Sequence, residues 1–225
     1  MGTFMGKHGQ FPPAESADSE GLVAVGGDLS VERLLAAYRS GIFPWTVYPI
    51  TWWSPDPRAV FAIDLFHVPR RLERTLKQGK FRVTFDTAFA DVVRGCAASA
   101  PGRTESWITP EFEKAYLRLH RLGWAHSAEA WLDGELAGGV FGIAIGGFFS
   151  GESMFHRRTD GSKVALASLM RHLHRQGFVL FDSQVMSPAA LRLGAVNIPR
   201  QVYLQQLRLA TRLPRSFMPT DVIHI

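Results

Sequence analysis

The sequence predicts an α+β protein in which a small N-terminal domain precedes a larger domain built on a mixed sheet. Two observations lead to this class. After residue 60, segments with the two-residue alternation of strands and segments with the helical spacing of apolar residues follow one another. Before residue 60 the composition differs, with four prolines and three tryptophans in residues 41–58. We therefore expect one domain over residues 1–60 and a second over residues 61–225.

The N-terminal domain is expected to hold one helix and one ordered loop. Residues 1–20 are small and polar, and we expect them to be loosely ordered. Ser30 is a favoured N-cap residue for a helix that Gly41 ends, and one face of this helix is apolar, with Leu34, Leu35 and Tyr38. In residues 41–58 the prolines exclude a regular helix, and the tryptophans require burial or a ligand. Core packing and a ligand wall both remain open for this aromatic loop.

The larger domain is expected to begin with two helices separated by a strand. A basic helix starts after Pro69 and ends near Gly79, and Phe81–Phe85 alternates as a strand. Thr109-Pro110 begins the next helix. The face of this helix that we expect to be buried carries Phe112, Ala115, Leu119 and Leu122.

Hairpins follow. Asp133-Gly134 forms a turn between strands over Ala125–Leu132 and Glu135–Ile145, and a third strand covers Phe148–Phe155. Ser162 is expected to cap a helix, and Phe178–Val185 forms a last strand. Antiparallel hairpins followed by a helix and a strand are typical of an acyl-CoA N-acyltransferase-like mixed-sheet domain, by analogy of arrangement.

Polar side chains interrupt two of these apolar strands. Glu152 lies in an aromatic strand, where an unpartnered carboxylate is costly, so it indicates a built site. Asp182 and Gln184 are two residues apart on the last strand and are expected to share one face. An amide beside a carboxylate suits an amine ligand. The three residues predict one polar pocket with apolar walls, and separate structural roles are the alternative.

The positive charge of the chain is concentrated in one segment. The net charge is +5 and the isoelectric point is near 9.7, which favours a polyanionic partner. Between His67 and Arg82, Glu73 is accompanied by six basic residues, namely Arg70, Arg71, Arg74, Lys77, Lys80 and Arg82. A phosphate-contacting stripe and a solvated helix face are both consistent with this pattern.

Composition argues against several classes of protein. A single cysteine, Cys96, excludes an internal disulfide, and the histidines show no zinc-binding spacing. The apolar runs are too short for a membrane span. Arg158–Lys163 partly matches a pyrophosphate-binding turn, but Lys163 stands where the backbone should approach phosphate, so a plain helix-entry turn is favoured. We expect a cytoplasmic protein without a metal ion.

An ordered series of motifs resembles one family. The series runs from about Phe11 to Leu207. Its motifs are Gly26–Ser30, Gly41–Trp45, Trp52–Arg58, Trp107–Thr109, Ala125–Ser127, Gly151–Phe155, Asp182–Gln184, and Leu193–Ala195 followed by Ile198–Arg200. Together they closely resemble the leucyl/phenylalanyl-tRNA–protein transferases. The resemblance implies an enzyme that moves Leu or Phe, and less well Met, from aminoacyl-tRNA to an N-terminal Arg or Lys. This addition marks the acceptor protein for degradation by the N-end rule.

The resemblance also implies a reaction that uses no coenzyme or metal, and it implies roles for particular residues. Asp182 and Gln184 would hold the reacting amine and the aminoacyl group, with Glu152 beside them. Trp45 and Trp107 would surround the terminal adenosine. The side-chain pocket would include Phe149 and Met154, with Val140 at a position often filled by Met, and the tRNA-binding residues would be Arg70, Arg71, Arg74, Lys77 and Lys80.

The chain departs from the family pattern at a few positions. Ala189 and Ala190 replace a usual His-Leu pair, Arg192 replaces a common serine, and Thr46 replaces a frequent aromatic residue. These differences bear on the dimensions of the pocket more than on the reaction. Two alternatives remain: an acyl-CoA-dependent N-acyltransferase, and a non-catalytic RNA-binding module. A non-catalytic RNA-binding module would give no role to Glu152, Asp182 and Gln184.

Overall fold

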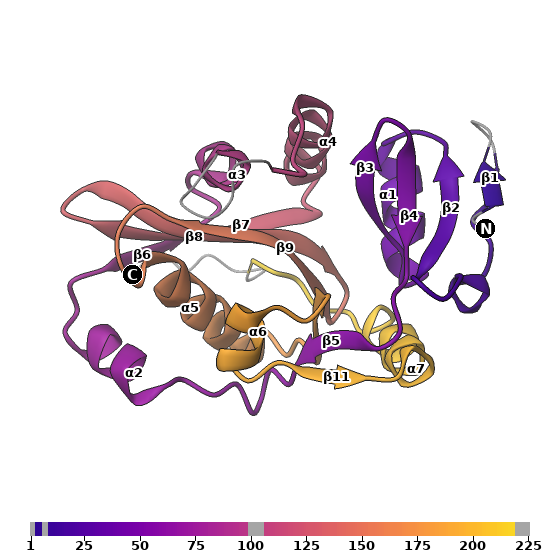
Figure 1. Ribbon diagram of the computed structural model, residues 1–225. Coiled ribbons are helices and arrows are strands. Elements are labelled where there is room, and N and C mark those ends of the chain that lie inside the picture. Colours follow the sequence, from indigo (N-terminus) through magenta and orange to yellow (C-terminus); the bar gives the residue numbers. More distant parts are fainter. Residues whose placement is uncertain (1–2, 6–8, 99–105, 219–225) are drawn as a thin grey trace.

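The computed structural model describes residues 3–5, 9–98 and 106–218. In this part of the chain a four-stranded sheet of N-terminal residues lies next to a seven-stranded sheet (Figure 1). The mixed seven-stranded sheet confirms the predicted α+β class. The domain boundary after residue 60 remains a prediction, and strand β5 (Arg58–Phe61), which belongs to the larger sheet, spans it.

The small sheet has the strand order β1-β2-β4-β3 and packs against helix α1 (Val31–Arg39). Ser30 accepts a hydrogen bond from the backbone N–H of Arg33, which confirms it as the N-cap. The predicted apolar face of α1 is buried as well. The strands are β1 (Thr3–Met5), β2 (Leu22–Gly26), β3 (Phe43–Val47) and β4 (Ile50–Trp53).

Two expectations for the N-terminal region are wrong. Much of the segment 41–58 is a hairpin of β3 and β4, because pairing of the two strands satisfies backbone groups while Phe43 and Trp52 enter the core. Residues 3–5 pair in parallel with β2, and Ala14–Ser16 form a short 3-10 helix, so these parts of residues 1–20 are ordered. Residues 1–2 and 6–8 lie outside the described residues.

The large sheet has the order β11-β5-β10-β9-β8-β7-β6. Its hairpin β7–β8 turns at Asp133-Gly134, as predicted. Besides β5, the strands are β6 (Arg82–Phe85), β7 (Ala125–Leu132), β8 (Glu135–Ile145), β9 (Phe148–His156), β10 (Leu180–Gln184) and β11 (Val196–Ile198).

Helices cover both faces of the large sheet (Figure 1). Helices α3 (Phe89–Ala97) and α4 (Pro110–Arg121) lie on one face, and α5 (Gly161–Arg175) lies on the other. Helix α2 (Arg70–Lys77) packs beside α5, as the predicted basic helix. The last two helices of the described residues are α6 (Pro188–Arg192) and α7 (Arg200–Ala210). The sheet separates two apolar clusters, one shared with the small sheet and one under α5.

Three details of the larger domain differ from expectation. Helix α3 was not predicted, because Ala88 offers no side-chain cap at its start. Leu122 is 55% exposed, since α4 ends before it and Gly123 reverses the chain. Ser162 lies inside α5 rather than at its cap, because the N-cap position is taken by Asp160 with a φ of 67°.

Strands β9 and β10 run in parallel and then separate. Their pairing covers only Leu180–Asp182 against Phe148–Ser150. The later residues of β9 stay paired with β8 but no longer pair with β10, and side chains from both strands border a cavity there. This separation positions the candidate site.

Candidate active site

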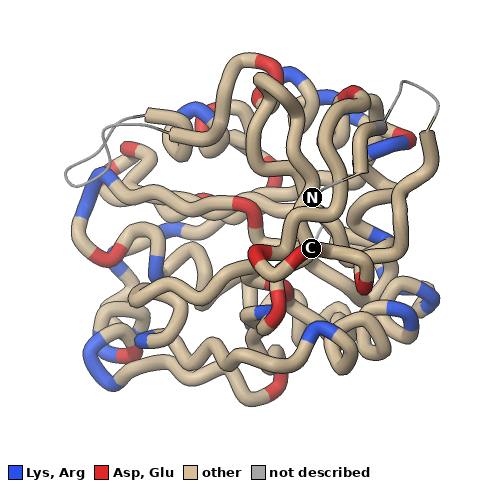
Figure 2. Tube along the Cα trace, turned by 45° about the vertical axis from the view of Figure 1, so that its right-hand side comes forward, with Lys and Arg blue, Asp and Glu red and all other residues tan. Residues whose placement is uncertain are grey.

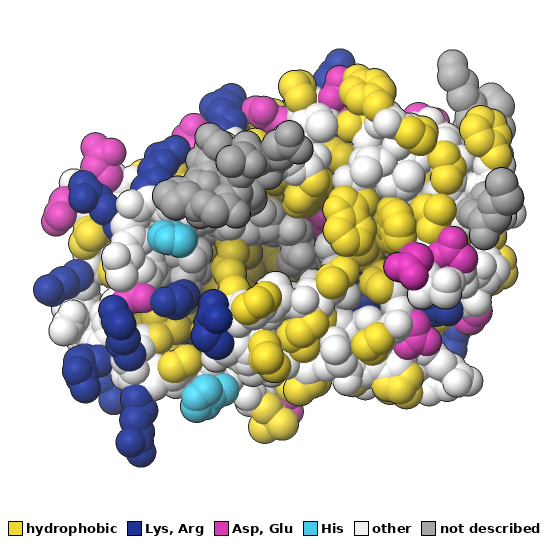
Figure 3. Space-filling model, in the orientation of Figure 1, with side chains coloured by type: hydrophobic (Ala, Val, Ile, Leu, Met, Phe, Trp, Pro, Cys, Tyr) yellow, Lys and Arg dark blue, Asp and Glu magenta, His cyan; other side chains and the backbone are white. Residues whose placement is uncertain are grey.

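A cavity of about 340 Å³ opens where β9 and β10 separate. One part of its wall is apolar and includes Phe61, Val140, Met154, Leu166 and Phe181. Another part is polar and includes Glu152, Ser183 and Gln184. Figure 3 shows a hollow on this face of the molecule, bordered by hydrophobic side chains. A ligand with an apolar side chain and a polar reacting group matches such a wall.

Two tryptophans reach this cavity from different parts of the fold. Trp45 extends from β3 of the small sheet and is 41% exposed, whereas Trp107 lies just before α4. Trp107 contacts Phe112 edge-on, with 5.1 Å between ring centroids. The cavity is therefore bordered by both sheets, and both tryptophans named from the sequence lie on it.

Glu152 is a buried carboxylate held by three donors. The Tyr116 hydroxyl donates to its Oε2 at 2.8 Å, and Ser150 Oγ and Gln184 Nε2 donate to its Oε1 at 3.0 and 3.1 Å. Burial raises the pKa of Glu152 to about 7, and the hydrogen bonds only partly oppose this effect. Glu152 therefore exchanges a proton near neutral pH, as an acid–base group requires.

The hydroxyl of Tyr116 extends this network into the N-terminal region. It lies 3.2 Å from the hydroxyl of Tyr38 on α1. Both rings are buried, and burial raises the pKa of each phenol well above its ordinary value. They are therefore neutral, and one of them donates to Glu152.

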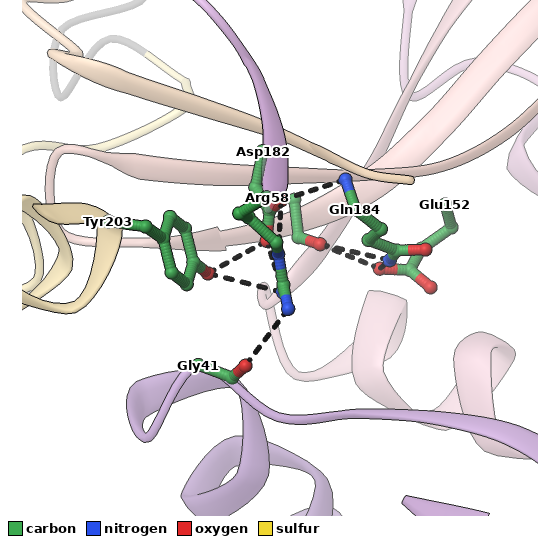
Figure 4. Close-up of polar contacts among 7 residues, drawn as sticks. Gly41, Arg58, Glu152, Asp182, Gln184 and Tyr203 are labelled. Carbon is green, nitrogen blue, oxygen red and sulfur yellow. Dashed lines mark hydrogen bonds and ion pairs between the residues drawn. The ribbon is translucent and has the colours of Figure 1, made fainter. Parts of the chain in front are cut away.

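Asp182 belongs to a second, fully buried network (Figure 4). Arg58 of β5 donates to both of its carboxylate oxygens, at 2.9 and 2.7 Å. The Tyr203 hydroxyl of α7 donates to the same carboxylate at 2.8 Å. Arg58 also donates to the carbonyl oxygen of Gly41 and lies over the ring of Phe43, 4.9 Å from its centroid. The side chain of Asp182 is thus committed to partners and does not line the cavity.

Burial alone would lower the pKa of Arg58, but the carboxylate of Asp182 raises it. The guanidinium therefore stays charged although it is 1% exposed. Buried ion pairs of this kind are strongly destabilising when one partner is removed. The pair consequently holds β5 and β10 together, and the hydrogen bond from Tyr203 adds α7.

Gln184 connects the two networks. Its backbone N–H donates to Asp182 Oδ1 at 2.8 Å, while its side-chain amide donates to Glu152. Its φ is 64°, and the register with β5 shifts between Asp182 and Gln184. The two side chains therefore have different partners, as Figure 4 shows, and the expected shared face is wrong because this irregularity breaks the strand alternation.

The other sequence-predicted residues divide into two groups. Val140 and Met154 lie on the cavity wall, facing each other as register partners of β8 and β9. Phe149 is fully buried behind the wall, where it stacks on Phe181 with 5.4 Å between centroids. Among the departures from the family pattern, Ala190 lines the cavity, whereas Thr46 lies outside its lining.

None of the five predicted tRNA-binding residues, four on α2 and Lys80 after it, lines the cavity. Arg70, Arg71, Arg74, Lys77 and Lys80 are all exposed, and Lys77 forms an ion pair with Glu73 at 2.8 Å. Lys and Arg gather over α2 at the lower left of Figure 3. Elsewhere on the trace they are interspersed with Asp and Glu (Figure 2).

Sequence reasoning missed several residues of the site. Arg58 was noted only as the end of a motif, since its partner lies 124 residues away. Tyr116 and Tyr203 carried no signal beyond apolar helical spacing. In the described ranges there is no group of three or more His, Cys, Asp or Glu side chains arranged to hold a metal ion. Nor does any helix of those ranges have the length and apolarity to cross a membrane.

Similar proteins share this sequence over nearly its whole length. A Leucyl/phenylalanyl-tRNA–protein transferase from Magnetococcus marinus is 54% identical over 217 residues, covering 92% of this chain and 91% of that protein. Another, from Nitratidesulfovibrio vulgaris, is 51% identical over 220 residues, covering 95% and 94%. Among solved structures, a GCN5-related N-acetyltransferase from Kribbella flavida matches with a TM-score of 0.39 and 11% identity, over 77% of this chain and 63% of that one. That similarity is too low to carry a functional argument.

Two parallel strands of a mixed sheet that separate around a lined cavity define an α+β protein with a ligand-sized pocket. The profile of the family described as Leucyl/phenylalanyl-tRNA protein transferase matches residues 60–208, and the profile of its N-terminal domain matches residues 27–56. The chain belongs to the leucyl/phenylalanyl-tRNA–protein transferase family.

Proposed function

We propose that this enzyme transfers Leu or Phe, and less well Met, from aminoacyl-tRNA to the N-terminal Arg or Lys of acceptor proteins. In the cytoplasm this addition would mark the acceptor for degradation by the N-end rule. The proposal needs no metal or coenzyme. One observation carries it: an apolar cavity ends at an amide–carboxylate pair, in which the half-buried Gln184 lies 3.1 Å from the buried Glu152.

The apolar part of the cavity suits the side chain of the donor amino acid. Met154 is flexible and adapts to Leu, Phe or Met, whereas Val140 adds a rigid wall. A β-branched side chain would collide near its Cβ. Trp45 and Trp107 would hold the terminal adenosine, where stacking contributes roughly 1–3 kcal/mol.

The polar part suits the attacking amine. Attack of the α-amino nitrogen on the ester carbonyl carbon forms the amide bond, and the bond to the ribose oxygen breaks. The ammonium group of the acceptor must first lose a proton, and Glu152, with a pKa of about 7, is matched to accept it from an amine of pKa near 8. The second proton passes to the leaving ribose oxygen.

Gln184 would orient the amine, since a neutral amide is too weakly basic to take its proton. Asp182 would act as a positioning residue, because its carboxylate already accepts hydrogen bonds from Arg58, Tyr203 and the backbone of Gln184. This arrangement supports catalysis chiefly by orientation of an ester that is already activated.

The acyl-CoA alternative is disfavoured at the start of α5. Asp160 is the N-cap residue, and its carboxylate makes no capping hydrogen bond but accepts one from Lys163 at 3.0 Å. Gly161 is pressed against β8, so closely that a Cβ there would lie 2.4 Å from the carbonyl oxygen of Ala137. A carboxylate at this helix terminus opposes the binding of a pyrophosphate.

A transfer assay separates the candidate functions. The protein is incubated with a peptide beginning with Arg and with either radiolabelled Phe-tRNA or radiolabelled acetyl-CoA. We expect label to reach the peptide from Phe-tRNA and not from acetyl-CoA. Label from acetyl-CoA alone would overturn the proposal, and tRNA binding without transfer would favour an RNA-binding module.

The basic stripe of α2 would contact acceptor-stem phosphates without reading sequence. Replacing Arg70, Arg71 and Arg74 with Ala should weaken tRNA binding and flatten its salt dependence, by about 0.7–0.9 in log–log slope for each lost contact. A matched control removes three exposed basic residues of α4, on a different face of the sheet: Lys114, Arg118 and Arg121. Equal effects of the two triple variants would contradict a role for the stripe.

A further inference from the structure

The C-terminal segment places an aromatic ring inside the protein, behind the cavity. Phe217 is 2% exposed although it follows the last helix and its neighbour Met218 is 41% exposed. His172 Nε2 lies 2.6 Å from the carbonyl oxygen of Phe217, and the ring of His126 stacks on the ring of Phe217 with 4.1 Å between centroids. A side chain so enclosed is held in one place.

The segment that leads to Phe217 is anchored as well. It crosses the β8–β9 turn, where a Cβ on Gly146 would lie 2.6 Å from the carbonyl oxygen of Thr211. Arg215 Nε then donates to the carbonyl oxygen of Gly177 at 3.3 Å. These contacts fix the path of the chain from α7 to the buried ring.

The ring of Phe217 begins a stack that ends at the cavity. Its centroid lies 5.9 Å from that of Phe149, and Phe149 lies 5.4 Å from Phe181, with interplanar angles of 29° and 27°. Phe181 lines the cavity and meets Phe61, another lining residue, edge-on at 5.5 Å. Phe149 itself does not line the cavity. It lies between Phe217 and Phe181 and contacts both rings.

Two glycines limit how the stacked rings can shift. A Cβ on Gly142 would lie 2.4 Å from the ring of Phe149, and a Cβ on Gly151 would lie 2.8 Å from the ring of Phe181. Both rings therefore rest against backbone on one side. Phe149 also neighbours the ring of Phe217, so removing that ring would open space into which Phe149 can move in an otherwise closely packed interior.

We propose that Phe217 is a positioning residue for the side-chain pocket, which it shapes from behind through Phe149 and Phe181. The proposal rests on the proposed function, in which this pocket receives the donor Leu or Phe. When Phe217 is present, the two rings are held toward the cavity and set its depth. Without it, Phe149 and Phe181 withdraw, and the pocket becomes deeper and less well fitted to Leu.

The test compares wild type, Phe217→Ala, Phe217→Leu and the control Met218→Ala. The values of kcat/KM are measured for Leu-tRNA and Phe-tRNA with one acceptor peptide. We expect the Leu-to-Phe ratio to fall about three- to tenfold in Phe217→Ala and less in Phe217→Leu, because one misfitted methylene group is worth about that much or more. Met218→Ala should keep the wild-type ratio. Partial unfolding of a variant lowers kcat/KM for Leu-tRNA and for Phe-tRNA by the same factor. The Leu-to-Phe ratio therefore reports the shape of the pocket.

A binding measurement distinguishes failure of this proposal from failure of the proposed function. The probes are the 3′-amide analogues of leucyl- and phenylalanyl-adenosine, titrated calorimetrically into each full-length variant. If wild type binds neither analogue, the cavity is not an aminoacyl site and both proposals fall. If wild type discriminates between the analogues and Phe217→Ala or Phe217→Leu keeps the same ratio, only the role of Phe217 is overturned. Should Phe217→Ala not fold, Phe217→Leu decides.

Discussion

Glu152→Gln should change how the stability of the enzyme depends on pH. Gln keeps the shape of the side chain and removes its titration. An exposed glutamate has a pKa of 4.5, whereas burial raises the pKa of Glu152 to about 7. Because folding raises this pKa, the protonated form stabilises the folded state below pH 4.5, and that stability is lost as the pH rises through about 7.

The size of the effect follows from the two pKa values. One pKa unit corresponds to about 1.4 kcal/mol, so the difference between pH 5 and pH 8 comes to roughly 2–3 kcal/mol for this group alone. The other carboxylates titrate in wild type and in Glu152→Gln alike, so their contributions cancel in the difference between the two. The quantity to compare is therefore the free energy of unfolding of wild type minus that of Glu152→Gln.

Urea unfolding at several pH values between 5 and 8 measures this difference. We expect the wild type to lose about 2–3 kcal/mol relative to Glu152→Gln across the range. Glu135→Gln, at the exposed start of β8, controls for the removal of one surface carboxylate. Parallel curves for wild type and Glu152→Gln would refute the reasoning, because they would mean that the pKa of Glu152 is the same in the folded and unfolded chain.

Two further predictions concern Arg58 and Trp45. Arg58→Gln should lower the free energy of unfolding by about 3–5 kcal/mol in urea titrations, because Asp182 is then buried without its cation. By contrast, Arg94→Gln removes a solvent-exposed arginine that pairs with Asp91 and Glu113, and it should cost less than about 1 kcal/mol. A similar loss in both variants would be evidence against the buried pair. Trp45→Ala should weaken binding of an aminoacyl-adenosine analogue about tenfold by calorimetry, since one stacking surface is lost. Trp131→Ala, on β7 and outside the cavity lining, should bind normally; if Trp45→Ala also binds normally, Trp45 does not hold the adenosine.

The elements with strong local signals were predictable from the sequence. Ser30 caps α1 and Asp133-Gly134 turns the β7–β8 hairpin because these residue types favour those backbone conformations by themselves. The burial of Glu152 followed from the apolar strand around it. Strands β1, β3 and β4 were not predicted, since they are short and their pairing partners are what stabilise them.

The residue types of the candidate site were predictable from the sequence, but the hydrogen-bond partners of these residues were not. Asp182 and Gln184 were found, yet their division between two networks depends on a φ of 64° at Gln184. Nothing in a glutamine predicts that conformation, which tertiary contacts impose. The pairing of Arg58 with Asp182 joins residues 124 positions apart, and the insertion of Phe217 depends on a tail that has no periodic pattern. Such contacts are set by topology rather than by local sequence.

The ion pair of Arg58 and Asp182 bears on how the molecule is divided into parts. Arg58 lies before the predicted boundary after residue 60, and Asp182 lies after it. A fragment that starts at residue 61 would therefore carry a buried aspartate stripped of its counter-ion, and would also lose the contact from Tyr38 to Tyr116. The contact of Tyr38 with Tyr116 and the hydrogen bond from Arg58 to the carbonyl oxygen of Gly41 join the N-terminal region to the larger sheet, so we expect melting to follow one transition rather than two.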